Sequence, residues 1–295
     1  MASREFLERL KGLGPKQLAL LALELQEKVE RLAKQAAEPI AIVGMSCRFP
    51  GAVTSPESYW RLLSEGVDAI SEIPGDRWDV EALFDPDPDA PGKMATRWGG
   101  FVADLANFDA EFFGITPREA ASMDPQQRLV LEVAWEALER AGHAPDGFER
   151  SRTGVFVGIC STDWFHLNAG SGPRDIDAYL ASGSSASMAS GRLSYLLGLQ
   201  GPSLSVDTAC SSSLMAVHLA CRSLRSGESN MAIAGGVHAI LVPEVMMTLS
   251  RAHMMAPDGR CKAFDARADA TCSCARLLMA PVYRVHAIWT ALVRE

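Results

Sequence analysis

A cysteine at the junction between a predicted strand and a predicted helix could act as a nucleophile. Residues 206–214 read Val-Asp-Thr-Ala-Cys-Ser-Ser-Ser-Leu, in which a strand ends, a tight turn follows and a helix begins at Cys210. The free N–H groups and the dipole at a helix N-terminus favour a thiolate over a thiol. Thiolates attack thioesters and can carry an acyl group as a covalent intermediate. The sequence therefore predicts thioester chemistry at Cys210.

The segment around this cysteine has the pattern of a β–α–β unit. Residues 203–207 alternate polar and apolar side chains, and a helix is expected over residues 210–225 with arginines near its end. Gly227 fits the residue after that helix, where glycine commonly ends a helix in the left-handed conformation. Residues 231–237 are continuously apolar or small, as in a buried parallel strand. The pattern predicts that the cysteine lies at the carboxyl end of a strand.

Other segments supply the layers expected around such a unit. Residues 40–44 and 154–159 are short apolar runs rich in β-branched residues, which predict buried strands. A helix should begin after Asp124, the expected N-cap, and end at Gly142. Strands that alternate with helices are typical of an α/β layered domain. We therefore expect an α/β fold with parallel strands.

Residues 1–37 differ from the rest of the chain. A short helix is expected from Ser3 to Leu10, and a second from about residue 16 to 37. Apolar residues recur along the second helix at the three- and four-residue spacing of a coiled-coil seam: Leu18, Ala22, Leu25, Val29, Leu32 and Ala36. Three heptads make a marginal helix in water, so we expect this segment to dimerise or to dock onto another chain. The alternative is an amphipathic helix that lies on its own domain.

Composition narrows the class of protein. The 295 residues are 48% hydrophobic and 22% charged with a net charge of −8, which is typical of a globular protein and argues against nucleic-acid binding. The N-terminus has no apolar signal core, and the longest weakly polar run is too short to span a membrane. Seven cysteines without a secretion signal indicate free thiols in a reducing compartment, so we expect a cytoplasmic protein.

Ordered motifs along residues 38–269 resemble the β-ketoacyl synthase family, specifically the ketosynthase domains of modular type I polyketide synthases. The motifs are, in order, EPIAIVGMSCRFPG at 38–51, GDRW at 75–78, NFD at 107–109, FFGI at 112–115, MDPQQR at 123–128, WEALE at 135–139, ASGRLSY at 189–195, GPS at 201–203, the segment around Cys210, and PDGRCKAFD at 257–265. The first 37 residues resemble the docking helices that precede such domains at the start of a polyketide synthase subunit.

The resemblance implies a thiolase-like fold, of which this chain holds the N-terminal half. It implies a decarboxylative condensation in which Cys210 is the catalytic, acylated nucleophile and its backbone N–H forms part of the oxyanion hole. Substrates would arrive on the phosphopantetheine of an acyl carrier protein, with no cofactor or metal bound by this chain. The implied partners are that carrier protein, an upstream polyketide synthase subunit, which residues 1–37 would contact, and a second copy in a homodimer.

The chain departs from the family pattern at its C-terminal end. The catalytic histidines of the family lie in His-Gly-Thr-Gly-Thr and Asn-x-Gly-His motifs, and neither occurs in this sequence. After Asp269 the family continues Gly-Tyr-Val, whereas this chain reads Ala-Thr-Cys-Ser-Cys; loss of one base could produce that change. We therefore predict that residues 270–295 are a frameshifted tail and that full condensation activity is lost. The alternative function is a catalytically dead fragment that acts only in docking or dimerisation.

Other candidate groups fit structural roles better. His218 lies two helical turns from Cys210, so we expect a packing or capping histidine there, and we expect Cys221 to belong to the core. A zinc site could be imagined from the residues Cys261, Cys272, Cys274 and His286. Their spacing matches no standard structural zinc pattern, so no metal site is predicted.

Overall fold

The chain divides into two compact units, residues 1–40 and 41–295. The computed structural model describes residues 10–37, 39–169, 176, 178–262, 265–266 and 293–294. None of the helices in these ranges is long and apolar enough to cross a lipid bilayer.

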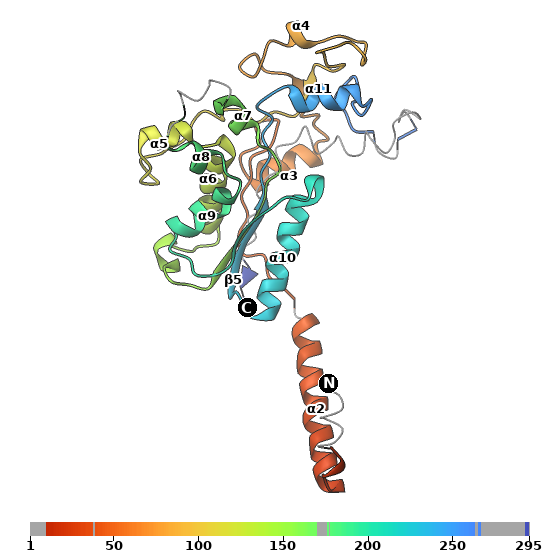
Figure 1. Cartoon of the computed structure of the whole chain (residues 1–295), viewed down its shortest axis with the longest axis vertical. Coiled ribbons are helices and arrows are strands. Elements are labelled where there is room, and N and C mark those ends of the chain that lie inside the picture. Colours follow the sequence, from red (N-terminus) through yellow and green to blue (C-terminus); the bar gives the residue numbers. More distant parts are fainter. Residues whose placement is uncertain are drawn as a thin grey trace. The chain divides into compact units, whose positions relative to one another are not determined.

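The first unit contains one long helix, α2, which spans Pro15–Ala37 (Figure 1). Proline at the first position suits a helix start, because the N–H that proline lacks would have no partner within the helix. The predicted second helix is thus confirmed, whereas the predicted helix from Ser3 lies outside the described residues, Leu10 excepted. Several apolar side chains of α2 are exposed, with Leu25 at 45% and Val29 at 64%. Pairing through this apolar stripe stays a prediction.

The second unit is built on a four-stranded sheet with the order β4-β3-β5-β6. Its strands are β3 Thr153–Gly158, β4 Ser203–Val206, β5 Met231–Gly236 and β6 Val293–Arg294. Strands β4, β3 and β5 run parallel, and only β6 is antiparallel to its neighbour. Every residue of β3 is buried, as expected for a central parallel strand that is covered on both faces.

Helices cover both faces of this sheet. The helix α10, Ser212–Ser226, packs on β3 and β5 from one side, while α6, Pro125–Arg140, and α9, Ser187–Leu196, lie on the other (Figure 1). The β–α–β unit predicted around Cys210 is therefore β4–α10–β5. The remaining elements are α3 Pro56–Ser64, β1 Ser71–Glu72, α4 Val80–Leu83, β2 Trp98–Gly99, α5 Pro117–Ser122, η1 Pro145–Phe148, α7 Asp163–Ala169, α8 Leu180–Ser184, η3 Ala209–Ser211 and α11 Glu244–Arg251.

The main core lies between the sheet and α6. It joins Val155 and Val157 of β3 to Val130, Val133 and Leu138 of α6, all of them at most 2% exposed. Burial of each such side chain stabilises the fold by about 1.5–3 kcal/mol, so α6 and the sheet form one packed layer pair.

The boundaries of α6 are those that the sequence predicts. The Asp124 side chain accepts a hydrogen bond from the backbone N–H of Gln126 at 2.8 Å, and Pro125 occupies the first turn. The chain leaves the helix at Gly142, which has φ of +71°. The N-cap and the left-handed glycine together account for both ends.

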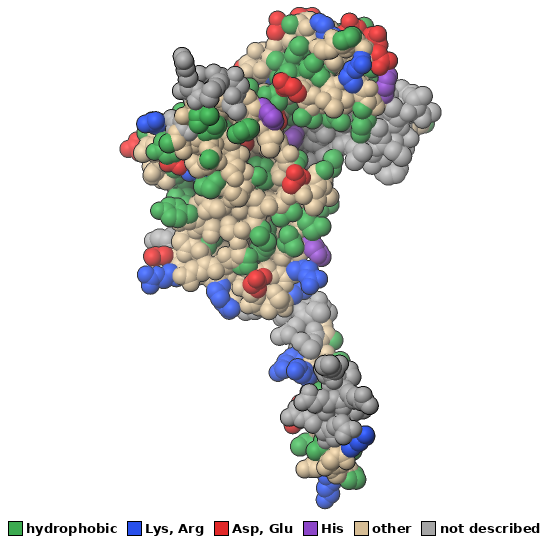
Figure 2. Space-filling model, viewed as in Figure 1, with side chains coloured by type: hydrophobic (Ala, Val, Ile, Leu, Met, Phe, Trp, Pro, Cys, Tyr) green, Lys and Arg blue, Asp and Glu red, His purple; other side chains and the backbone are tan. Residues whose placement is uncertain are grey.

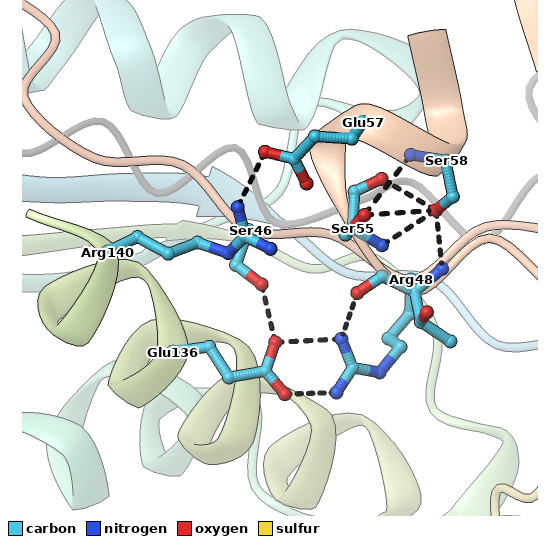
Figure 3. Close-up of polar contacts among 8 residues, drawn as sticks. Ser46, Arg48, Ser55, Glu57, Ser58, Glu136 and Arg140 are labelled. Carbon is cyan, nitrogen blue, oxygen red and sulfur yellow. Dashed lines mark hydrogen bonds and ion pairs between the residues drawn. The ribbon is translucent and has the colours of Figure 1, made fainter. Parts of the chain in front are cut away.

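The segment that precedes α3 is tied to α6 by a polar network (Figure 3). Glu136 accepts hydrogen bonds from Ser46 Oγ at 2.5 Å and from Arg48 Nη1 at 2.8 Å, and Arg48 Nη2 pairs with its second oxygen. Arg140, one turn further along α6, donates to Glu57 of α3 at 2.8 Å. These contacts link residues about 90 positions apart in the sequence.

The predicted strand at residues 40–44 is wrong, because this segment forms no strand. Ile42 is 60% exposed, and Gly44 instead lies against α6, where an added Cβ would come within 2.3 Å of the Ala137 carbonyl oxygen. An apolar, β-branched run becomes a strand only when a neighbouring strand pairs with its backbone. In the described chain, β4, β3, β5 and β6 pair among themselves and leave this segment unpaired.

Candidate active site

Cys210 lies in a single 3₁₀ turn between β4 and α10. The α-helix begins two residues later than predicted, at Ser212, and Cys210 is exposed just ahead of it. Ala209 adopts the left-handed conformation with φ of +54°, which is strained for a residue with a Cβ. Its N–H donates to Asp207 Oδ1 at 2.9 Å and its carbonyl accepts from Ser212 Oγ at 2.6 Å. These bonds hold a sharp turn that presents the thiol.

Two glycines allow the start of α10 to lie directly on the sheet. Gly158 of β3 and Gly236 of β5 are register partners. A Cβ added at Gly158 would lie 2.5 Å from the carbonyl carbon of Ser212, and one at Gly236 would lie 2.5 Å from Ser213 Cβ. A larger residue at either position would push the first turn of α10 outward, and Cys210 with it.

A cavity of about 270 Å³ opens at the carboxyl ends of the three parallel strands. Its lining includes Cys160 after β3, Asp207 and Cys210 after β4, and His238 after β5. This is the edge of an open parallel sheet at which ligands commonly bind. The rest of the cavity lining is mostly apolar and is formed by Gly158, Ile159, Ala209, Ser212, Ser213, Gly236 and Val237.

Cys160 and His238 contact each other within this cavity. The Sγ atom of Cys160 lies 4.0 Å from His238 Nδ1. The Cys160 side chain reaches solvent through the cavity, yet the protein atoms around its sulfur raise the pKa of the thiol to about 11. The negative charge of Asp207 adds to this effect. Cys160 is therefore a neutral thiol at neutral pH.

The sequence reasoning missed Cys160 and His238, although a usable signal was present. Each follows a buried run that the sequence predicts to be a strand, and the carboxyl ends of parallel strands meet at one edge of the sheet. The register pairs Gly158 with Gly236, which places Cys160 and His238 at equivalent positions two residues beyond.

The structure corrects two expectations on α10. His218 is exposed and does not line the cavity, so it is not the expected packing histidine. Cys221 is half-buried at the helix surface and does not belong to the core. The helix turns these side chains outward because the buried stripe of α10 runs through Ala216, Ala220 and Leu224 instead.

The candidate zinc ligands Cys272, Cys274 and His286 lie outside the described residues, as does the predicted tail from residue 270, the pair 293–294 excepted. Among the side chains that are described, no group of three or more His, Cys, Asp and Glu residues could hold a metal ion.

Comparison with known proteins identifies the family to which this chain belongs. The sequence profile described as "Beta-ketoacyl synthase, N-terminal domain" matches residues 37–274. The chain belongs to the β-ketoacyl synthase family. The resemblance stated from the motifs is confirmed, and the matched region contains both Cys210 and the rest of the cavity lining.

Curated relatives of this ketosynthase segment are proteins of polyketide synthases. It is 54% identical over 262 residues to one phenolphthiocerol/phthiocerol polyketide synthase protein of Mycobacterium tuberculosis, with 89% of this chain and 14% of the relative covered. A second protein of the same synthase and organism is 54% identical over 266 residues, which cover 90% of this chain and 17% of the relative. The chain thus spans less than a fifth of the length of these relatives.

Solved ketosynthase structures share the fold. An oxazolomycin ketosynthase domain from Streptomyces albus matches with a TM-score of 0.76 and 36% identity over 88% of this chain and 43% of that one. The ketosynthase from module 6 of the bacillaene synthase of Bacillus subtilis matches with a TM-score of 0.72 and 36% identity, covering 86% of this chain and 40% of that one. The predicted fold, a thiolase-like α/β fold present as its N-terminal half, is confirmed.

Proposed function

We propose that this chain carries the acyl-accepting cysteine of a polyketide ketosynthase. The observation that supports this most directly is the exposed Cys210 thiol, held on a strained turn at the mouth of a cavity and immediately ahead of α10. A nucleophile in this position can reach a thioester that enters the cavity, and the positive end of the α10 dipole favours a developing oxyanion there.

The proposed step is transfer of an acyl group between two sulfurs. The Cys210 sulfur attacks the thioester carbonyl carbon and forms a carbon–sulfur bond, and the bond to the phosphopantetheine sulfur of the acyl carrier protein breaks. The proton lost by Cys210 ends on the departing thiol. The later decarboxylative condensation requires further groups, and the matched ketosynthase structures are more than twice as long as the region they share with this chain.

The proposed partners follow from surfaces that this chain leaves exposed. Apolar side chains remain at the surface of the second unit (Figure 2), among them Leu204 of β4 at 44% and Leu214 of α10 at 74% exposed. Exposed apolar surface of this kind favours association, in keeping with a homodimer. Residues 1–37 would contact an upstream polyketide synthase subunit, and a cytoplasmic location fits the thiol chemistry at Cys210.

Acylation of the purified chain tests this function. The protein is incubated with a butyryl thioester of N-acetylcysteamine, a short mimic of phosphopantetheine, and its intact mass is followed. We expect one added butyryl group, mapped to Cys210 by peptide analysis, and none in Cys210→Ser. Addition of malonyl-acyl carrier protein then reports condensation through a β-ketoacyl product. A folded chain that gains no butyryl group would instead support the docking or dimerisation function.

A further inference from the structure

The segment that carries His238 is held in place by two buried side chains, Gln126 of α6 and Asp163 of α7. The N–H of Ala239 donates to Gln126 Oε1 at 3.2 Å, and the N–H of Leu241 donates to Asp163 Oδ2 at 3.0 Å. Gln126 and Asp163 are 0% and 5% exposed. Both hydrogen bonds, which fix the chain just after His238, are therefore shielded from solvent.

The amide of Gln126 can hold its orientation because both of its ends are engaged. Its Nε2 donates to Asp124 Oδ2 at 3.1 Å while its Oε1 accepts from Ala239. Asp124 is itself the N-cap of α6. The start of α6 is thus linked through one amide to the backbone next to His238, so the imidazole is carried by a rigid part of the fold.

The ring of His238 is also oriented on its Nδ1 side. Cys160 Sγ lies 4.0 Å from that nitrogen, and the Cys160 thiol remains protonated at neutral pH because its surroundings raise its pKa to about 11. In the tautomer that carries the proton on Nδ1, the neutral sulfur accepts the hydrogen bond from Nδ1–H, and Nε2 then holds the lone pair that can take up a proton. Cys160 therefore does not compete with Cys210 as a thiolate.

We infer that His238 is the proton carrier for acyl transfer at Cys210, with Cys160, Gln126 and Asp163 as the residues that position it. Nε2 of His238 takes the thiol proton as the Cys210 sulfur bonds to the thioester carbonyl carbon. The resulting imidazolium gives that proton to the departing sulfur as its bond to the carbonyl carbon breaks. The inference rests on the proposed acyl-accepting function, and it assigns a role to a histidine outside the two histidine motifs of the family.

The test compares two histidine substitutions on the full chain. His238→Ala removes the imidazole from the cavity, and His218→Ala removes an exposed imidazole from α10 as the matched control. The second-order rate constant for butyrylation of Cys210 is measured at pH 7 by intact mass. Because positioned general acid–base groups contribute about 10²–10⁴-fold, we expect a loss of about 100-fold in His238→Ala and no change in His218→Ala.

Added imidazole separates a proton-transfer role from a structural one. Imidazole should restore the rate of His238→Ala in proportion to its concentration and should leave His218→Ala unaffected. Cys160→Ser, which retains a hydrogen-bond acceptor, should keep more activity than Cys160→Ala. Unchanged acylation in His238→Ala, or a loss that imidazole does not reverse, would overturn the inference.

Alkylation by iodoacetamide distinguishes failure of this inference from failure of the proposed function. In this reaction the Cys210 sulfur bonds to the acetamide carbon, iodide leaves and the thiol gives up the same proton, but no thioester has to be recognised. Suppose that the parent chain gains no butyryl group but is alkylated at Cys210 faster than His238→Ala. That result would refute the acyl-accepting function and would support the role of His238 as proton carrier. Equal alkylation rates in the two chains would refute the proton carrier.

Discussion

The close approach of α10 to the sheet can be tested at Gly158. In Gly158→Ala the new Cβ would lie 2.5 Å from the carbonyl carbon of Ser212 and 2.6 Å from the backbone nitrogen of Ser213. Both atoms belong to the backbone, so no side-chain rotation relieves the contact. Ordinary van der Waals separation begins near 3.4 Å, and the first turn of α10 would therefore have to retreat by about 0.9 Å.

The expected cost combines two opposing effects. Overpacking of a buried site costs typically about 1–3 kcal/mol. Replacement of a strand glycine by alanine by itself stabilises by about 0.5–1 kcal/mol, because glycine loses more backbone freedom on folding. We therefore expect Gly158→Ala to lower the free energy of unfolding by up to about 2.5 kcal/mol, with a central value of roughly 1 kcal/mol. The displaced turn should also slow acylation of Cys210.

Urea denaturation followed by circular dichroism measures the first effect and intact-mass kinetics the second. Gly191→Ala is the matched control: it lies inside α9, and an added Cβ there meets no atom within 4 Å. We expect this control to gain about 0.5–1 kcal/mol in stability and to acylate normally. A Gly158→Ala chain that is as stable as the parent and is acylated at the same rate would refute the reasoning.

Three further predictions concern other parts of the fold. Burial raises the pKa of Asp124 to about 6, so its contribution to stability is fully present below its ordinary value of 3.8 and is lost as pH rises through about 6. Asp124→Asn, which keeps the N-cap, should therefore flatten the dependence of the urea midpoint on pH between about pH 4 and 7; an unchanged slope would contradict this. Glu136→Ala and Arg48→Ala should each cost about 1–3 kcal/mol, with a double variant that costs less than their sum by denaturation; full additivity would contradict the pairing. Leu25→Lys should retain the helix α2 and reduce the self-association of the chain measured by light scattering, because it places a charge in the exposed apolar stripe. Unchanged self-association would contradict a role for this stripe in pairing.

Local signals in the sequence were sufficient for elements whose ends are set by neighbouring residues. The N-cap at Asp124 and the left-handed Gly142 define α6, and a continuous apolar run defines β3. The position of Cys210 between a strand and a helix was also evident, because strand, turn and helix follow one another directly. Only the first α-helical residue differed, since a 3₁₀ turn precedes α10.

Local signals failed where pairing between distant segments decides the outcome. Residues 40–44 have the composition of a buried strand, yet strand formation depends on a backbone partner, which composition does not reveal. His218 lies on a helix that the sequence predicts. The sheet against which this helix packs decides which of its side chains are buried, and His218 is not among them.

The amino-acid sequence indicated Cys210 as the candidate nucleophile and indicated the family. It also predicted α2, α6, α10 and the three parallel strands β3, β4 and β5, because each of these rests on residues that are adjacent or close along the chain. Tertiary structure alone decided which groups surround Cys210. Cys160 and His238 are 50 and 28 positions away from it, and they meet it only because β3, β4 and β5 align in parallel with Gly158 beside Gly236. Strand order and register are properties of the folded sheet, and they created the cavity.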